Sequence, residues 1–306
     1  PVKLFADLQA TGDIFQAQTW QGQVYTQLPV QPWHQWLTKP IISDSQIIKA
    51  EFGGDYWLTL EAGQVQEVTA QVLVPDLQIR YQQQDITLQQ FSAQLSWQQQ
   101  QPYWQATLEQ AQGRINQQAV VLKQFSMEQA TPSSLFIGLQ ELDIAQIAPV
   151  LASLKLTPPL LKTWLIQAQP TGKISKLWAD IDSKPFRINK ISAQLQQLSA
   201  LATQKIIGCH QVDIWLNHQN KQGYAGVKIA NGQLDLKPIY RQPTPIEQLQ
   251  VAVKWTDLDD AWLLETNRLT LKNVDAQGEA VLSVWLPKQD MSAAQMQLLA
   301  NITQGN

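Results

Sequence analysis

Apolar and polar residues alternate with a period of two along most of this chain. The pattern is strict over residues 68–74, 91–97 and 249–255, where apolar side chains take every second position. Successive side chains of an extended strand point to opposite faces, so each segment has one apolar face and one more polar face. Many short segments of this kind, separated by turn residues, predict a mainly β chain of antiparallel strands.

Glycine, proline and asparagine divide the alternating segments. We expect turns at Gly53-Gly54-Asp55, at Pro75 and at Asn231-Gly232, with one strand ending before each and another beginning after it. Because the predicted strands are short and close together, neighbours along the chain should pair as hairpins. Further strands are predicted at residues 187–195, 211–217, 249–255, 262–266, 269–272 and 280–286.

The middle of the chain has a different period. Apolar residues recur at helical spacing over residues 144–154 and again over 158–169. Asp143 and Thr157 precede these two segments, and both residue types cap helix N-termini. Pro170 ends the second pattern, since proline interrupts a helix. We therefore expect two short helices in an otherwise β-rich chain.

This helical pair divides the chain into three parts. We expect an N-terminal β segment at 1–142, a helical hinge or plug at 143–172 and a C-terminal β segment at 173–306. A cap over the sheet is the simpler role for the helices, and a gate is the more specific one. The candidates for a gate or plug are the apolar residues Leu161, Trp164 and Leu165.

The two β segments share a local pattern. Trp97 ends one alternating run and Trp104 follows it seven residues later, just as Trp255 ends another run and Trp262 follows. Aromatic pairs across a hairpin are also common in unrelated sheets. The pattern is therefore compatible either with two copies of one β-module or with two ordinary hairpins.

A sheet with one apolar face must have that face covered. Two such sheets could stack as a sandwich, or one sheet could close into a barrel. A long sheet bent into an open trough would leave more apolar surface exposed than a soluble monomer usually tolerates, unless an apolar ligand fills it. The pattern alone favours a sandwich or a barrel.

Composition excludes several classes of function. Charged residues make up 15% of the 306 residues and the net charge is −3, which does not suit a nucleic-acid-binding protein. The sequence contains no apolar run of about 18 residues, so no transmembrane helix is expected in it. It opens on PVKLFADLQATG, with neither an initiator methionine nor a leader, so we expect a segment of a longer protein.

No constellation of residues points to catalysis or to a metal or other cofactor. The three histidines are scattered along the sequence, which does not fit a metal site. Cys209 is the only cysteine, so no internal disulfide can form. Its neighbour His210 should point to the opposite face of a strand, which argues against a nucleophile and base pair. We therefore expect a protein that is not an enzyme.

Several stretches resemble the YhdP-type AsmA-like proteins of Gram-negative bacteria. They are LTPPLLKTWLIQAQPTGKI, PFRINKISAQLQQLSA, IANGQLDLKPIYRQPTPIEQLQVAVKW and WLLETNRLTLKNVDAQGEAVL, which follow one another in the second half. The first half, with WLTLEAGQVQEVTAQVLVPDLQI and the hairpin around Trp97 and Trp104, is similar less specifically. The resemblance covers most of the chain and rests on the ordered series of stretches.

This resemblance implies a different architecture from the sandwich or barrel. The fold would be an elongated, twisted antiparallel β-groove in the periplasm, part of a protein anchored in the inner membrane by a helix outside this segment. The expected partners are phospholipid acyl chains and components of the inner and outer membranes, with a monomeric chain. The candidate lipid-binding residues are the apolar residues Val72, Phe91, Leu95, Trp97, Trp104, Leu108, Leu249, Val251, Val253, Trp255, Trp262, Leu269 and Leu271.

Two alternatives to lipid transport stay open at this point. The chain has 12 tryptophans, and tryptophans exposed on one flat face could stack on sugars in a carbohydrate-binding β-sandwich. A structural spacer in the periplasm would instead have a fully packed interior and no ligand.

Overall fold

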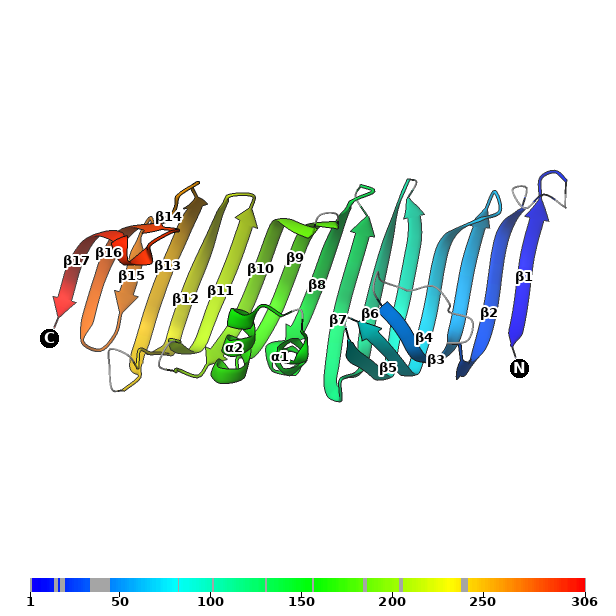
Figure 1. Cartoon of the computed structure of the whole chain (residues 1–306), viewed down its shortest axis with the longest axis horizontal. Helices are drawn as coiled ribbons and strands as arrows, with labels where there is room; N and C mark the ends of the chain where they lie inside the picture. Colours follow the sequence, from blue (N-terminus) through cyan, green and yellow to red (C-terminus); the bar gives the residue numbers. More distant parts are fainter. Residues whose placement is uncertain are drawn as a thin grey trace. The chain divides into compact units, whose positions relative to one another are not determined.

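A computed structural model describes residues 2–13, 16, 20–33, 45–81, 83–100, 102–129, 131–155, 157–183, 186–203, 206–237 and 242–305. The chain forms two compact units. Unit 1 comprises Pro1–Leu142 and Ser153–Leu156, and unit 2 comprises Asp143–Ala152 and Thr157–Asn306. Both units consist mainly of antiparallel strands, which confirms the predicted fold class (Figure 1).

Unit 1 is a meander in which each strand pairs antiparallel with the next. No pairing joins β1 to β8 among its described residues, so this sheet is not closed into a barrel. Its strands are β1 (Lys3–Ala10), β2 (Trp20–Pro32), β3 (Ser45–Glu61), β4 (Gln64–Tyr81), β5 (Gln84–Gln100), β6 (Tyr103–Ile115), β7 (Gln118–Gln129) and β8 (Ser134–Asp143).

Unit 2 begins with the predicted pair of helices and continues as a second antiparallel meander (Figure 1). The helices are α1 (Ile144–Ser153) and α2 (Pro159–Ala168). The other elements are β9 (Thr171–Ser183), β10 (Phe186–Ala200), β11 (Gly208–Gln219), β12 (Gln222–Asp235), β13 (Thr244–Asp257), β14 (Ala261–Thr266), β15 (Leu269–Lys272), β16 (Ala276–Pro287), the 3-10 helix η2 (Met291–Ala293) and β17 (Gln295–Gly305). The short strands β14 and β15 each pair with both β13 and β16, so together they occupy one strand position in the sheet.

Three of the predicted turns are wrong, because the strands run through them. β3 continues through Gly53-Gly54, β4 through Pro75 and β12 through Asn231-Gly232. Gly54 shows why a turn residue occurs inside a strand. Its φ is 141°, and a Cβ there would lie 2.0 Å from the carbonyl oxygen of Gln71. The glycine is required by the close approach of β4 and by a backbone conformation that other residues avoid.

Residues with left-handed backbone recur inside the strands of both units. Their φ angles lie between 51° and 58°, and they are Gln90, Gln110 and Glu141 in unit 1 and Gln197, Gln211 and Asn231 in unit 2. The pairing register shifts next to several of them, as between Gln89 and Ser92 in β5 and between His210 and Val212 in β11. Shifts of this kind mark β-bulges, which bend a strand and increase its twist. Both sheets are therefore bent along their strands.

The two helices start differently. Asp143 caps α1 as predicted, since its Oδ1 accepts a hydrogen bond from the Ala145 backbone N–H at 2.8 Å. The expected cap by Thr157 is wrong, because Pro158 occupies the N-cap of α2 and makes no side-chain cap bond. The Thr157 hydroxyl instead donates to the carbonyl oxygen of Leu151 and ties the start of α2 to the last turn of α1.

Candidate functional site

In unit 1, the pairing register places every lipid-binding candidate on one face of the sheet. We call this the apolar face of unit 1. Two rows of directly opposed residues cross all its strands. One row is Ala6, Val24, Leu58, Val68, Trp97, Ala106, Met127 and Ile137, and the next is Leu4, Thr26, Tyr56, Ala70, Leu95, Leu108, Phe125 and Leu139.

The remaining candidates of unit 1 continue this face. Val72 lies opposite Ala93 and Phe91 opposite Val74, while Trp104 lies opposite Gln99. Small residues below the larger side chains are buried, with Ala70 at 4% and Ala93 at 7% exposure. The candidates themselves are half-buried. No helix of the described part of unit 1 packs on them.

Unit 2 has an apolar face built in the same way. Leu249, Val251, Val253 and Trp255 alternate with exposed polar or small residues along β13, so all four share one face. Leu271 lies opposite Leu249, which puts Leu269 and Leu271 on that face too. Rows of opposed residues extend it across the sheet, for example Leu177, Ala193, Leu216, Ala225 and Val253 from β9 to β13.

The paired tryptophans have the same geometry in both units. Trp97 lies opposite Ala106 across the β5–β6 hairpin, and Trp104 lies opposite Gln99. Trp255 lies opposite Leu264 across β13 and β14, and Trp262 lies opposite Asp257. In each hairpin the second tryptophan is therefore a diagonal neighbour of the first on the apolar face, which confirms that the two hairpins are equivalent locally.

The helix pair packs on one part of the apolar face of unit 2. Ile144 and Ala148 of α1 and Leu165 of α2 form a cluster with the strand residues Leu198, Val212, Ile229, Ile246 and Leu249. Ile229 is fully buried and Leu249 is 9% exposed. Of the three gate candidates, Leu165 lies in this cluster, Trp164 packs against it and Leu161 is 42% exposed.

The rest of this face has no helix over it within the described residues. Val251, Val253, Trp255 and Trp262 are half-buried, whereas the adjacent Gln250 and Lys254 on the opposite face are exposed. Sequence patterns place all these candidates on one face, but they do not show that helices cover Leu249 and leave the next residues along β13 partly open.

Polar residues also occur on the apolar face of unit 2, and sequence reasoning missed Thr266 and His218 among them. Thr266 is opposite Val253 and only 6% exposed. Its hydroxyl accepts a hydrogen bond from the backbone N–H of Leu282 at 2.7 Å and donates to the Leu282 carbonyl oxygen at 3.4 Å. His218 stacks on Trp255 with ring centroids 5.8 Å apart. A Cβ on Gly223 would meet the Trp255 ring, so this glycine makes room for the stack.

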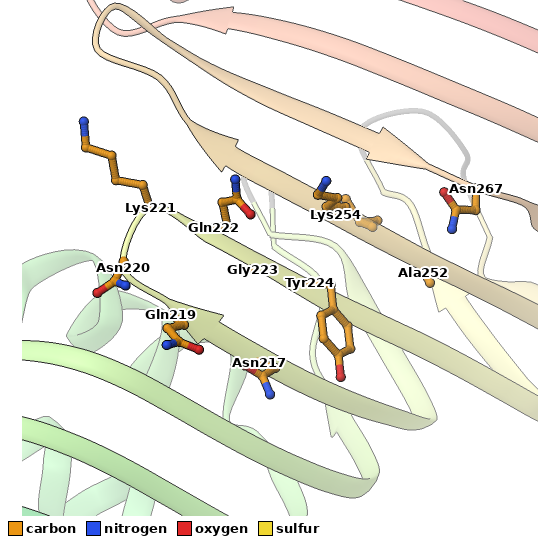
Figure 2. Close-up of a pocket in the computed structure, with 11 residues that line it drawn as sticks. Asn217, Gln219, Asn220, Lys221, Gln222, Gly223, Tyr224, Ala252, Lys254 and Asn267 are labelled. Carbon is orange, nitrogen blue, oxygen red and sulfur yellow. The ribbon is translucent and has the colours of Figure 1, made fainter.

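A hollow of about 780 Å³ lies on the other face of unit 2 (Figure 2). It is lined mainly by polar side chains, among them Asn217, Tyr224, Lys254 and Asn267. Of the lipid-binding candidates, only Val253 borders it. Apart from Val253, the candidates thus lie away from this hollow, on the opposite side of the sheet.

Most charged groups take part in exposed ion pairs, but Asp257 lies opposite Trp262 on the apolar face of unit 2 and pairs there with Lys288. Hydrogen bonds and charge from Arg80 lower the pKa of Asp85 in unit 1, and Arg268 lowers the pKa of Glu279 in unit 2. Burial raises the pKa of the Cys209 thiol, which keeps it protonated. No group of His, Cys, Asp and Glu in the described part of the chain could hold a metal ion.

The comparison with protein-family models decides which family this sheet belongs to. The model described as "YhdP protein" matches residues 1–306. The chain belongs to the YhdP family. This confirms the resemblance seen in the sequence, and membership in the family indicates lipid transport in the broad sense rather than catalysis.

The other comparisons add no relative. Neither the search of curated proteins nor the search of solved structures gave a match. Within the described residues, neither helix of this YhdP family member has the length and apolar character needed to cross a membrane.

Proposed function

We propose that this YhdP family chain is a segment of a bridge-like protein that carries phospholipids between the inner and outer membranes. In this proposal the segment lies in the periplasm and the intact protein is anchored in the inner membrane. The apolar faces of the two units hold the acyl chains, and the candidate residues of both faces form the lipid-binding surface. Transport of this kind requires no covalent step and no cofactor.

The observation that carries the proposal is the continuity of the apolar rows. In unit 1 a row of eight opposed apolar residues, from Ala6 to Ile137, crosses every strand. The candidates on this face are half-buried although no described helix of unit 1 packs on them. Side chains on the inner side of a bent sheet shelter one another, so this exposure fits an apolar face that lines the inside of the bend.

The energetics favour such a surface. Moving a sixteen-carbon acyl chain from an apolar environment into water costs on the order of 13 kcal/mol, at about 0.8 kcal/mol per CH₂. Leu, Val, Trp and Phe side chains offset most of that cost. Because neighbouring rows offer similar apolar contacts, a lipid can move from one row to the next against small barriers. The head group is too polar to bury without partners and stays in water.

The helix pair has a supporting role in this proposal. α1 and α2 rest on Val212, Ile229 and Leu249, and Leu165 is part of the same buried cluster. Such packing suits a fixed wall that limits the width of the lipid path in unit 2. The path then runs over Val251, Val253 and Trp255, beside the helices.

The first test is whether the protein carries lipid. The protein is purified from native membranes by gentle extraction, and organic extracts are analysed by mass spectrometry beside an unrelated soluble protein treated in the same way. We expect an excess of phospholipid over this control. No excess would contradict the proposal.

The second test separates a lipid surface from an ordinary core. Val253→Asp and Leu95→Asp place a charge on the two apolar faces, and Ala252→Asp and Gln94→Asp place it on the opposite faces as matched controls. We expect the first pair to lose bound phospholipid and transport while circular dichroism shows a folded chain. If the first pair unfolds the chain, or keeps its lipid, these side chains are not a lipid-binding surface.

A further inference from the structure

Three aromatic residues form a row on the face of unit 1 that lies opposite its apolar face. In each unit we call this opposite face the polar face. Phe5 of β1 lies opposite Tyr25 of β2, which lies opposite Trp57 of β3. The ring centroids are 6.0 Å apart for Phe5 and Tyr25 and 5.3 Å apart for Tyr25 and Trp57. We call these three residues the aromatic row. It faces away from the apolar rows, since Tyr25 and Trp57 alternate with Val24 and Leu58.

The aromatic row is accessible. Phe5 is 64% and Trp57 is 44% exposed. Trp57 is the one exposed tryptophan among those that the structure describes. The hydroxyl of Tyr25 donates a hydrogen bond to Asp55 Oδ1 at 2.8 Å, which holds its ring in place between the other two. Cross-strand contact explains why the rings touch one another, but not why this face exposes the rings of Phe5 and Trp57 to water.

Hydrogen-bonding side chains follow the aromatic row on both sides. On one side, each residue of a row lies opposite the next on the neighbouring strand, in the order Asp7, Gln23, Thr59 and Glu67. The row on the other side is Gln27, Asp55 and Gln71. A hollow of about 510 Å³ includes all three rings with Gln23 and Glu67. A second, of about 290 Å³, adjoins Trp57 and includes Gln71, Gln94 and Glu109.

The charge of this surface restricts what it can bind. Carboxylates occur on both sides of the rings, and the linings of the two hollows contain no lysine or arginine. Lys3 stands at one end of the flanking row, opposite Gln27. Phosphate or sulfate groups would be repelled along most of the surface, so nucleic acids and anionic lipid surfaces fit poorly.

We propose that the aromatic row and its flanking carboxylates and amides bind a neutral glycan chain. The C–H faces of successive sugar rings stack on Trp57, Tyr25 and Phe5, and the sugar hydroxyls donate to Glu67, Asp7 and the glutamine amides. The rings repeat with the spacing of neighbouring strands, so a glycan lying across the strands can place its sugars on consecutive rings. This site is on the face opposite the candidate lipid surface and does not rest on lipid transport.

Titration calorimetry of the 306-residue chain with chitohexaose and cellohexaose tests this proposal. Saturable binding of at least one is expected, and Trp57→Ala and Trp57→Leu should each weaken it about tenfold, the loss of one aromatic stacking contact. Trp57→Leu keeps an apolar strand residue, so it separates stacking from folding. Tyr224→Ala is the matched control, because Tyr224 is 48% exposed on the polar face of unit 2.

The outcomes are distinct. Weakened binding in both Trp57 variants, with unchanged binding in Tyr224→Ala and unchanged circular dichroism, supports the glycan site. Unchanged oligosaccharide binding in both Trp57 variants, or no binding of either oligosaccharide at millimolar concentration, overturns the glycan site. Binding to phosphatidylglycerol vesicles that Trp57→Ala abolishes would assign the aromatic row to a membrane surface instead. None of these results depends on whether lipid is found on the apolar faces.

Discussion

Unit 1 and unit 2 have the same alternation of side chains, but within the described residues only unit 2 packs helices on its apolar face. Ile229 and Leu249 lie in a closed cluster under α1 and α2, whereas Leu95 and Leu108 of unit 1 are half-buried without such cover. One type of strand pattern therefore supports two environments. The apolar face is a conventional core where helices cover it and a partly open surface elsewhere.

This difference shows that alternation alone does not distinguish a core from a ligand surface. Val253 and Leu249 are four residues apart on one strand and share a face, yet Leu249 is buried by the helices and Val253 is not fully buried. If the open parts of both faces bind lipid, the residues near the helices should matter for stability and those beyond them for transport.

The largest effect is expected where unit 2 is closed. Ile229→Ala removes a fully buried side chain and should lower the free energy of unfolding by about 3 kcal/mol, through lost burial and a cavity. Leu95→Ala in unit 1 should cost about 1 kcal/mol, because its side chain is only half-buried. Urea unfolding followed by circular dichroism measures both. Equal losses would mean that the two faces are equally packed.

The glycines at the strand bends provide a second comparison. Gly54→Ala should destabilise unit 1 by about 2 kcal/mol, since the residue has a positive φ and its new Cβ would clash with the Gln71 carbonyl. Gly172→Ala in unit 2 should cost less, because the nearest atoms would be 2.9 Å from its Cβ. Thermal unfolding of the two variants shows which substitution costs more stability. If Gly54→Ala leaves the stability unchanged, the bend tolerates residues other than glycine.

A smaller effect is expected at the start of α1. Asp143→Ala removes the side-chain cap on the Ala145 N–H and should destabilise the helix pair by about 1 kcal/mol. Thr157→Val, which removes the hydroxyl bond to Leu151 without removing a cap, is the comparison variant. Hydrogen exchange should show faster opening of α1 in Asp143→Ala while the protection of β3 to β6 stays unchanged. Opening of both units together would contradict an independent helix cover.

The smallest effect concerns the exposed ion pairs, which the two units have in common. Arg80 lowers the pKa of Asp85 and Arg268 lowers that of Glu279. Carboxylates with a lowered folded-state pKa stabilise the fold above their unfolded pKa, and this stability is lost as the pH falls through the folded value. Asp85→Asn and Glu279→Gln should each reduce the loss of stability on acidification slightly. The free energy of unfolding is measured against pH for each variant and the parent chain. Equal slopes would show that solvent screens these ion pairs so strongly that they do not stabilise the fold.

Much of the fold follows from the sequence because the period of two assigns residues to faces without knowledge of the register. All thirteen lipid-binding candidates therefore fall on the apolar faces of their units. Glycine and asparagine occur both at turns and at bends within long strands, so the turns predicted at Gly53-Gly54 and Asn231-Gly232 are wrong. The sequence does contain a signal for such bends. Apolar residues three positions apart, such as Leu88 and Phe91 or Leu195 and Leu198, indicate a β-bulge within a strand rather than the end of the strand.

Other features depend on register and packing, and no local pattern reveals them. The aromatic row requires Phe5, Tyr25 and Trp57 to be opposed on three different strands. The stack of His218 on Trp255 requires the glycine at position 223 between them. Thr157 has the side chain and the position of a helix cap, but its hydroxyl donates a hydrogen bond to the carbonyl oxygen of Leu151 instead. In each case a nonlocal contact decides the role of the residue.

Photo-cross-linking from neighbouring positions on opposite faces tests most directly whether the apolar faces hold lipid. A photoreactive phenylalanine derivative is introduced at Val253 or Leu95 and, as matched controls, at Lys254 or Gln94, in the protein expressed in a Gram-negative host with radiolabelled phospholipid. If the apolar faces hold lipid, labelled lipid adducts form at Val253 and Leu95, and only background labelling occurs at Lys254 and Gln94. Equal labelling of the two faces, or no labelling at Val253 and Leu95, would show that the apolar faces do not hold lipid.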